Sequence, residues 1–204
     1  MSQNYLQIRN DYLQKAWARS PGELAVCLPA TEAAGSLQFR AFGEDCLLAP
    51  DTVTLGGKPA EGPEGLLIAL YASVVPGVPV RLKPLKSFKE LPGTMPYQQA
   101  FSVNAEQILV PQVASIHLHQ ESLVQAFSGQ SNTDAPSGDF SFTLYPLPRV
   151  PLYYIFYLAD EEFPAAVTCL FAANAAEIMP VDGLADVAEY TARKMLMDLA
   201  ARPR

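Results

Sequence analysis

The amino-acid sequence predicts an α+β fold, with one or more antiparallel sheets and helices packed on one side. Hydrophobic residues follow helical spacing in some segments and alternate in others, and the two kinds come in blocks, without strict strand–helix alternation. Eighteen prolines divide the chain into short elements, which argues against a long helical bundle. A hydrophobic content of 50% in 204 residues is enough for the core of one domain.

The N-terminal segment predicts an amphipathic helix, because apolar residues recur there at steps of three and four. The helix is expected to stop at Ser20-Pro21-Gly22, where proline and glycine end the pattern. From about 24 to 60 the pattern changes to alternation, as at Leu37, Phe39 and Ala41, and glycine-rich turns separate the alternating runs. This β-rich part is expected to form an antiparallel meander.

The middle of the chain, from about 64 to 128, is expected to be mostly helical. It opens with a continuously apolar run at 66–72, which predicts a buried helix, and Pro111 predicts a break further on. Residues 129–139 are rich in Gly, Ser, Asn, Asp and Pro, and therefore predict a surface loop.

Strands and a helix are expected in the C-terminal part, from about 140 to 201. Residues 140–145 alternate aromatic and small polar side chains, whereas 151–158 are almost continuously apolar, which predicts a strand buried on both faces. An amphipathic helix is predicted from about 182 to 201. The whole chain, 1–204, is expected to form a single α+β domain.

Composition argues against two classes of partner. The formal net charge of −7 would repel nucleic-acid backbones, and the few basic residues do not cluster, so no nucleic-acid binding is predicted. The longest apolar run, 66–80, is too short for a membrane span and is interrupted by Pro76 and Pro79. We therefore expect a soluble, acidic protein that neither crosses nor binds a membrane.

Cysteine usage predicts a cytoplasmic location. Cys27, Cys46 and Cys169 are odd in number and far apart, which fits a reducing compartment better than a disulfide framework. The N-terminus also lacks the pattern of a signal peptide. The cysteine spacing contains no iron–sulfur or zinc motif, so the sequence identifies no cofactor.

Three consecutive carboxylates, Asp160, Glu161 and Glu162, follow the apolar strand and are candidate ligand-binding residues. Carboxylates at a strand end can hold a metal ion or a cationic ligand, and clustered acids can raise one another's pKa and supply a general acid. The alternative is structural: an N-cap and first-turn acids of a helix that begins near Phe163.

Arg149 is the fourth candidate, because Pro148 and Pro151 stiffen the backbone around it. A guanidinium held in this way suits a carboxylate or phosphate of a ligand. The alternative is an internal salt bridge to an acid of the 160–162 turn.

The two histidines give only a weak metal signal. In the helix expected here His117 aligns with Glu121, whereas His119 diverges from it, and such a pair lacks a third ligand. No metal site is therefore predicted.

Several segments resemble a bacterial and archaeal family of unknown function. They are the apolar helix at 66–71, the basic loop at 87–93, the Leu-Pro-Arg-Val-Pro segment at 147–151 and the Asp-Glu-Glu-Phe-Pro segment at 160–164. Some members carry an extra cysteine-rich domain and are described as iron–sulfur proteins, and some are linked to corrinoid or one-carbon metabolism. This chain lacks clustered cysteines, so the resemblance implies an accessory role and no cluster-binding residue.

Three functions are compatible with these features. The first is a non-enzymatic accessory domain that binds a small ligand or a protein partner, since catalytic signatures are missing and one end of a large apolar core is polar. The second is a small enzyme that uses the 160–162 acids with Arg149. The third is an assembly subunit whose apolar surface is covered by a partner.

Overall fold

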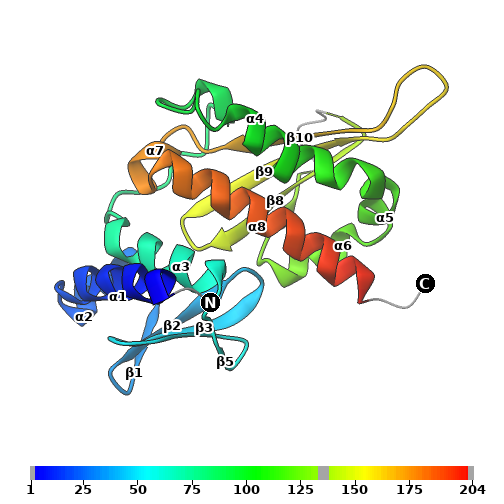
Figure 1. Cartoon of the computed structure of the whole chain (residues 1–204). Helices are drawn as coiled ribbons and strands as arrows, with labels where there is room; N and C mark the ends of the chain where they lie inside the picture. The colour runs from blue at the N-terminus through cyan, green and yellow to red at the C-terminus, as the bar shows by residue number, and fades with distance from the viewer. Residues whose placement is uncertain (1–2, 133–137, 202–204) are drawn as a thin grey trace.

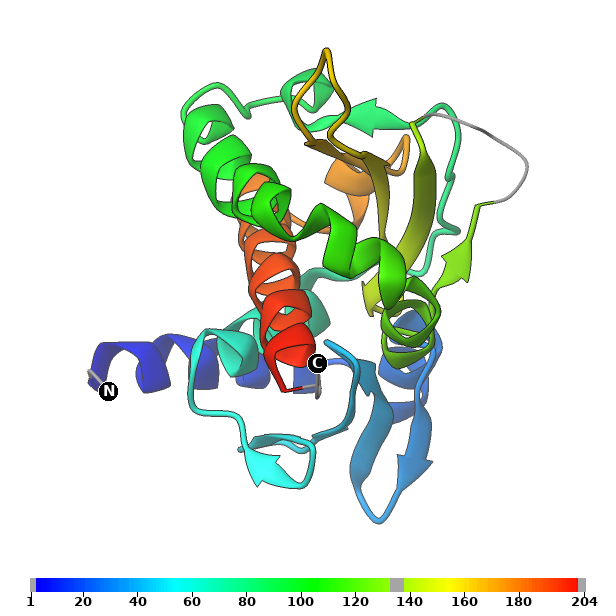
Figure 2. The same cartoon turned by 90° about the vertical axis from the view of Figure 1, so that its right-hand side faces the viewer.

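The computed structural model describes residues 3–132 and 138–201, and it has the predicted α+β fold with two five-stranded antiparallel sheets. Helix α8 (Val181–Ala200) lies along one face of the second sheet, as Figures 1 and 2 show. The surface loop expected at 129–139 falls partly on 133–137, which lie outside the described residues.

The first sheet is a meander whose strands follow chain order: β1 (Thr31–Ala33), β2 (Ser36–Ala41), β3 (Glu44–Leu48), β4 (Val53–Leu55) and β5 (Lys58–Pro59). Its register places Phe39 opposite Cys46 and Cys46 opposite Leu55, and all three side chains are buried. The alternating pattern therefore forms the expected sheet, with one face toward the core.

The Ser20-Pro21-Gly22 segment begins a helix, which the sequence reasoning missed. Helix α1 (Gln3–Trp17) ends before it, and α2 (Pro21–Cys27) starts with Pro21 in its first turn. The Ser20 hydroxyl accepts a hydrogen bond from the backbone N–H of Glu23 at 3.3 Å. Proline, which lacks a backbone N–H, is tolerated here because an N–H at the first helical position would have no acceptor within the helix.

The second sheet has the strand order β6 (Lys86–Ser87), β10 (Ala166–Phe171), β9 (Val150–Tyr157), β8 (Phe140–Leu147) and β7 (Gln130–Ser131). Strand β9 lies at its centre, and all its residues except Tyr157 are buried. This confirms the prediction of a strand covered on both faces.

Helices connect the two sheets. Helix α3 (Pro63–Val74) packs against both α1 and α8, and it also contacts β4 of the first sheet. The C-terminal helix α8 begins and ends within one residue of the predicted bounds. None of the described helices is long and apolar enough to span a membrane.

The middle of the chain is helical but irregular. After α3 its helical elements are the short η1 (Phe88–Glu90), α4 (Gln98–Phe101), the π-helix η2 (Ser102–Glu106), the 3₁₀-helix η3 (Gln107–Gln112), α5 (Val113–Leu118) and α6 (Gln120–Ala126). The short α7 (Ala175–Ile178) lies in the C-terminal part. Pro111 lies inside η3, and α-helical structure resumes only after it. The predicted break is confirmed.

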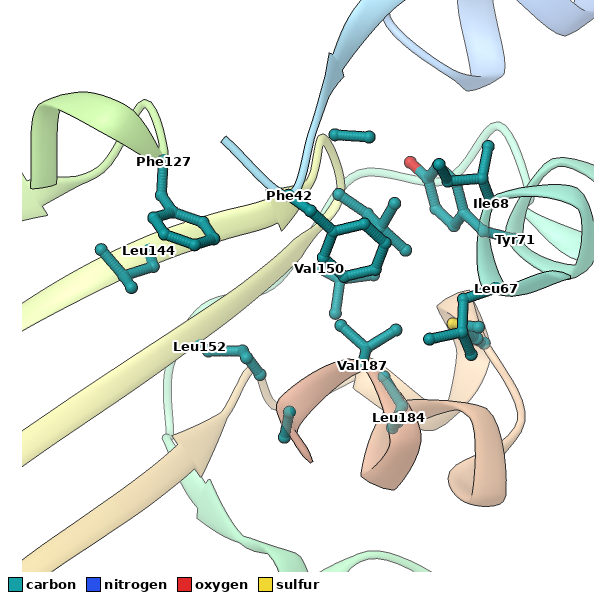
Figure 3. Packing of buried hydrophobic residues seen from close by; sticks show 14 of the residues in the cluster. Phe42, Leu67, Ile68, Tyr71, Phe127, Leu144, Val150, Leu152, Leu184 and Val187 are labelled. Carbon is teal, nitrogen blue, oxygen red and sulfur yellow. The ribbon is translucent and has the colours of Figure 1, made fainter. Parts of the chain in front are cut away.

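One hydrophobic cluster joins both sheets and the helices. Figure 3 shows Phe42, from the turn between β2 and β3, among Leu67 and Tyr71 of α3 and Val187 of α8. All four side chains are buried. The cluster therefore holds the first sheet, α3 and α8 in one packed unit.

Candidate functional site

Arg149 occupies the turn between β8 and β9, where it connects three segments. Its Nε donates to the carbonyl oxygen of Cys27 at 2.7 Å, and its two Nη atoms donate to the carbonyls of Val78 at 2.9 Å and Val26 at 3.0 Å. Its backbone N–H donates to the Tyr71 hydroxyl at 3.2 Å. Two of these carbonyls lie at the end of α2, where a cation also suits the helix dipole.

The structure does not bring Arg149 together with the 160–162 acids. They lie at opposite ends of β9, whose eight residues span roughly 26 Å at the usual rise of a strand. The salt bridge considered in the sequence analysis is therefore wrong, because the guanidinium is bonded to backbone carbonyls at the other end of the strand. A ligand site shared by these four residues is not assembled here.

Asp160 closes the turn between β9 and β10. Its Oδ1 accepts hydrogen bonds from the backbone N–H groups of Glu162 at 2.8 Å and Phe163 at 2.7 Å, and its own N–H donates to the Phe163 carbonyl at 3.0 Å. These N–H donors hold the pKa of Asp160 below its ordinary value. No helix begins at Phe163, because the chain enters strand β10 at Ala166. Glu161 and Glu162 are exposed.

The histidine region carries no metal centre in the part of the chain that the structure describes. His117 stacks on Phe140 with ring centroids 4.6 Å apart, and His119 Nδ1 lies 2.9 Å from the Ser115 carbonyl oxygen. Glu121 lines a shallow hollow beside them. Nowhere among the described residues do three His, Cys, Asp or Glu side chains gather in a way that could hold a metal ion.

A buried polar cluster that sequence reasoning missed consists of Glu106, Tyr154 and Cys169. Glu106 ends the π-helix η2, and its Oε1 accepts a hydrogen bond from the backbone N–H of Cys169 at 3.0 Å. Tyr154 is the register partner of Cys169, and its buried hydroxyl makes no well-formed hydrogen bond within the described residues, although it lies beside the thiol. Burial raises the pKa of all three groups.

The three cysteines are free and buried. Burial raises the pKa of Cys46 to about 12, and that of Cys169 well above its ordinary value. A thiol with a raised pKa carries little thiolate at neutral pH, so neither cysteine is suited to nucleophilic chemistry.

A pocket of about 220 Å³ opens between α1, α3 and α8. Its lining residues are Tyr5 from α1, Pro63, Leu66 and Leu67 from α3, and Asp186, Glu189, Tyr190 and Arg193 from α8. Helix α3 thus supplies an apolar wall and α8 a polar wall. The four α8 residues are spaced three, four and seven apart from the first, which places them on one helix face.

Acidic groups dominate the charge of this pocket. Asp186 is exposed overall, but partial covering of its carboxyl group raises its pKa, and the nearby carboxylates of Glu189 and Asp182 raise it further. Arg193 Nη2 lies 2.7 Å from Glu189 Oε1 and so pairs with that acid. Burial, followed by the charge of Glu64, raises the pKa of Tyr190 to about 12.

The pocket was not found from the sequence, although one signal exists. The pattern of Asp186, Glu189, Tyr190 and Arg193 along a predicted helix is visible, but it is also the pattern of an ordinary solvated face. Only the approach of α3 and α1, which are distant in sequence, turns that face into a pocket wall.

Comparison with known proteins gives one match. The model of DUF3786, described as a domain of unknown function, matches residues 21–194, a span that contains the pocket residues of α3 and α8. No curated protein and no solved structure matches the chain. The resemblance to a family of unknown function is therefore confirmed at that level, whereas the iron–sulfur and corrinoid associations stay predictions.

Replacing Arg149 by Met should lower the free energy of unfolding by about 2 kcal/mol, because three hydrogen bonds from a charged donor are lost. Urea denaturation measures this. The matched control is Arg81→Met, which removes an exposed ion pair with Glu177 and should cost less than about 1 kcal/mol. Equal effects of the two variants would contradict the structural role of Arg149.

Asp160→Asn should lower the melting temperature at neutral pH less than Asp160→Ala, because the Asn side-chain oxygen still accepts the two N–H bonds. The folded-state pKa of Asp160 is depressed, so its charge contributes stability above the ordinary pKa, and this is lost as pH falls through the folded value. The difference between wild type and Asp160→Asn should therefore shrink as pH falls below the ordinary pKa of an aspartate and disappear below the folded-state pKa. Melting curves across pH would refute this by showing a constant difference.

Tyr154→Phe should raise the free energy of unfolding by about 1 kcal/mol, because it removes a buried hydroxyl that lacks a good partner. Tyr71→Phe is the control with the opposite sign. It removes a buried hydroxyl that accepts the Arg149 N–H, and it should cost about 1 kcal/mol. A loss of stability in both variants would mean that the Tyr154 hydroxyl is bonded.

Proposed function

The chain belongs to the DUF3786 family, whose function is unknown, and we propose that it is a non-enzymatic domain that binds a small ligand in the pocket between α1, α3 and α8. The observation that carries this proposal is the composition of that pocket. An apolar wall with a few convergent polar groups is the usual form of a small-molecule site. Its volume of about 220 Å³ suits a compact ligand.

The rigidity of the pocket supports the proposal. Leu67 is buried in the core, and Tyr190 packs edge-on against the buried ring of Phe42 with centroids 4.6 Å apart. Both pocket walls are therefore continuous with the hydrophobic cluster. A site that needs little reorganisation loses less free energy when it orders a ligand.

The chemistry of the other candidates favours binding over catalysis. The hydrogen bonds of Arg149 to three carbonyls leave it poorly placed to bind a substrate anion. A general acid at neutral pH needs a raised pKa, whereas that of Asp160 is lowered. The enzyme hypothesis thus loses support at Arg149 and Asp160, and it stays a prediction, as does the assembly-subunit hypothesis.

The biological setting of this binding role is a finer proposal. The family resemblance supports an accessory function beside metal- or corrinoid-dependent one-carbon metabolism. The free state of all three cysteines supports a reducing, cytoplasmic location.

Filling the pocket tests the proposal. Leu66 is partly exposed at the pocket wall, so Leu66→Trp should occupy the cavity without disturbing the core. The control is Met197→Trp, which adds the same bulk at an exposed position of α8 outside the pocket. Fragments found by ligand-observed NMR should bind wild type and Met197→Trp equally, and should bind Leu66→Trp at least about tenfold more weakly.

Melting curves must show that both tryptophan variants are folded. If folded Leu66→Trp binds the same fragments with unchanged affinity, the pocket is not the site and the proposal fails.

A further inference from the structure

The polar wall of the pocket leaves one charge uncompensated. Among the described residues of the lining Arg193 is the only basic one, and it is already paired with Glu189 at 2.7 Å. Within the described residues Asp186 makes no ion pair. The carboxylate of Asp186, which is exposed at the pocket lining, therefore has no ionic partner there.

The surroundings of the pocket add more negative charge. The charge of Asp182, one turn earlier on α8, raises the pKa of Asp186, and the charge of Glu64 of α3 raises the pKa of Tyr190. Lys194, a further basic residue of α8, is held by Glu44 at 2.9 Å and by Asp198 at 3.2 Å. Arg193 and Lys194, the basic residues of this part of α8, are thus both paired with acids, and the carboxylates along α8 favour a cation on that side of the pocket.

From this arrangement, and resting on the proposed function, we infer that the ligand is a small organic cation, with an ammonium or amidinium group joined to a compact apolar body. The cationic group pairs with Asp186, and the apolar body lies against Leu66 and Leu67 of α3. Tyr190 borders the same space, so its ring adds an aromatic surface that attracts cations.

The other ligand charges fit less well. An anionic ligand would have to take Arg193 from Glu189, which would leave two acids unpaired in the pocket. A neutral ligand would cover Asp186 and withdraw water from it without supplying an opposite charge. Partial burial and acidic neighbours already raise the pKa of Asp186, and an added cation reverses that effect.

Three probes of one shape and different charge test the inference: benzylammonium, benzyl alcohol and benzoate. Isothermal titration calorimetry of the full chain should give benzylammonium an affinity at least about tenfold higher than either of the others. Asp186→Asn should abolish that preference. The control Asp51→Asn makes the same change of net charge at an exposed turn outside the pocket, and it should leave the preference intact.

A second variant moves the affinity in the opposite direction. Arg193→Gln frees Glu189 from its ion pair and should tighten benzylammonium binding by about threefold. Weaker binding in this variant would mean that Arg193 itself contacts the ligand, and the inferred ligand class would be wrong.

The outcomes separate this inference from the proposed function. If benzyl alcohol or benzoate binds as tightly as the amine, and Leu66→Trp weakens that binding, the pocket binds small molecules but the cationic class is wrong. A preference for the amine that survives Asp186→Asn also overturns the inference. If no probe binds and Leu66→Trp leaves fragment binding unchanged, both proposals fail.

Discussion

The insertion of Phe42 between the two sheets is the contact on which the rest of this structure depends. Phe42 lies in the turn between β2 and β3 with a positive φ of 49°, a conformation that a bulky residue adopts only under constraint from its surroundings. Its backbone N–H donates to the Pro146 carbonyl of β8 at 2.6 Å, and its ring is fully buried (Figure 3). One residue thus joins the sheets through its backbone and its side chain.

The same contact shapes the pocket. The ring of Phe42 meets the ring of Tyr190 edge-on. The turn between β2 and β3 therefore packs directly against a residue of the polar pocket wall on α8. Helix α3 completes the arrangement, because neighbouring residues on it have different tasks: Leu67 enters both the core and the pocket wall, whereas Tyr71 accepts the Arg149 N–H. Because the same residues pack the core and line the pocket, a substitution that alters the core packing also alters the shape of the pocket.

Sequence patterns predicted the elements whose cause is local. The meander, the central strand β9 and helix α8 follow from periodicity, which depends only on neighbouring residues. The turn at Asp160 could not be separated from a helix start, because a helix-capping carboxylate also accepts N–H groups two and three residues ahead. The pocket and the Glu106 cluster need segments far apart in sequence to meet, and no local pattern encodes that.

Arg149 shows where such a limit matters for function. The prolines around it correctly indicated a fixed guanidinium, but its partners, the carbonyls of residues 26, 27 and 78, are defined only by the folded chain. Two segments that carry the family resemblance thus have structural roles. Segment 147–151 connects distant parts of the chain through Arg149, and segment 160–164 forms the turn between β9 and β10. A motif that builds the fold need not contain the site. Asp186, to which we assign the choice of ligand, lies outside those segments, on a helix face whose pattern alone looks like ordinary surface.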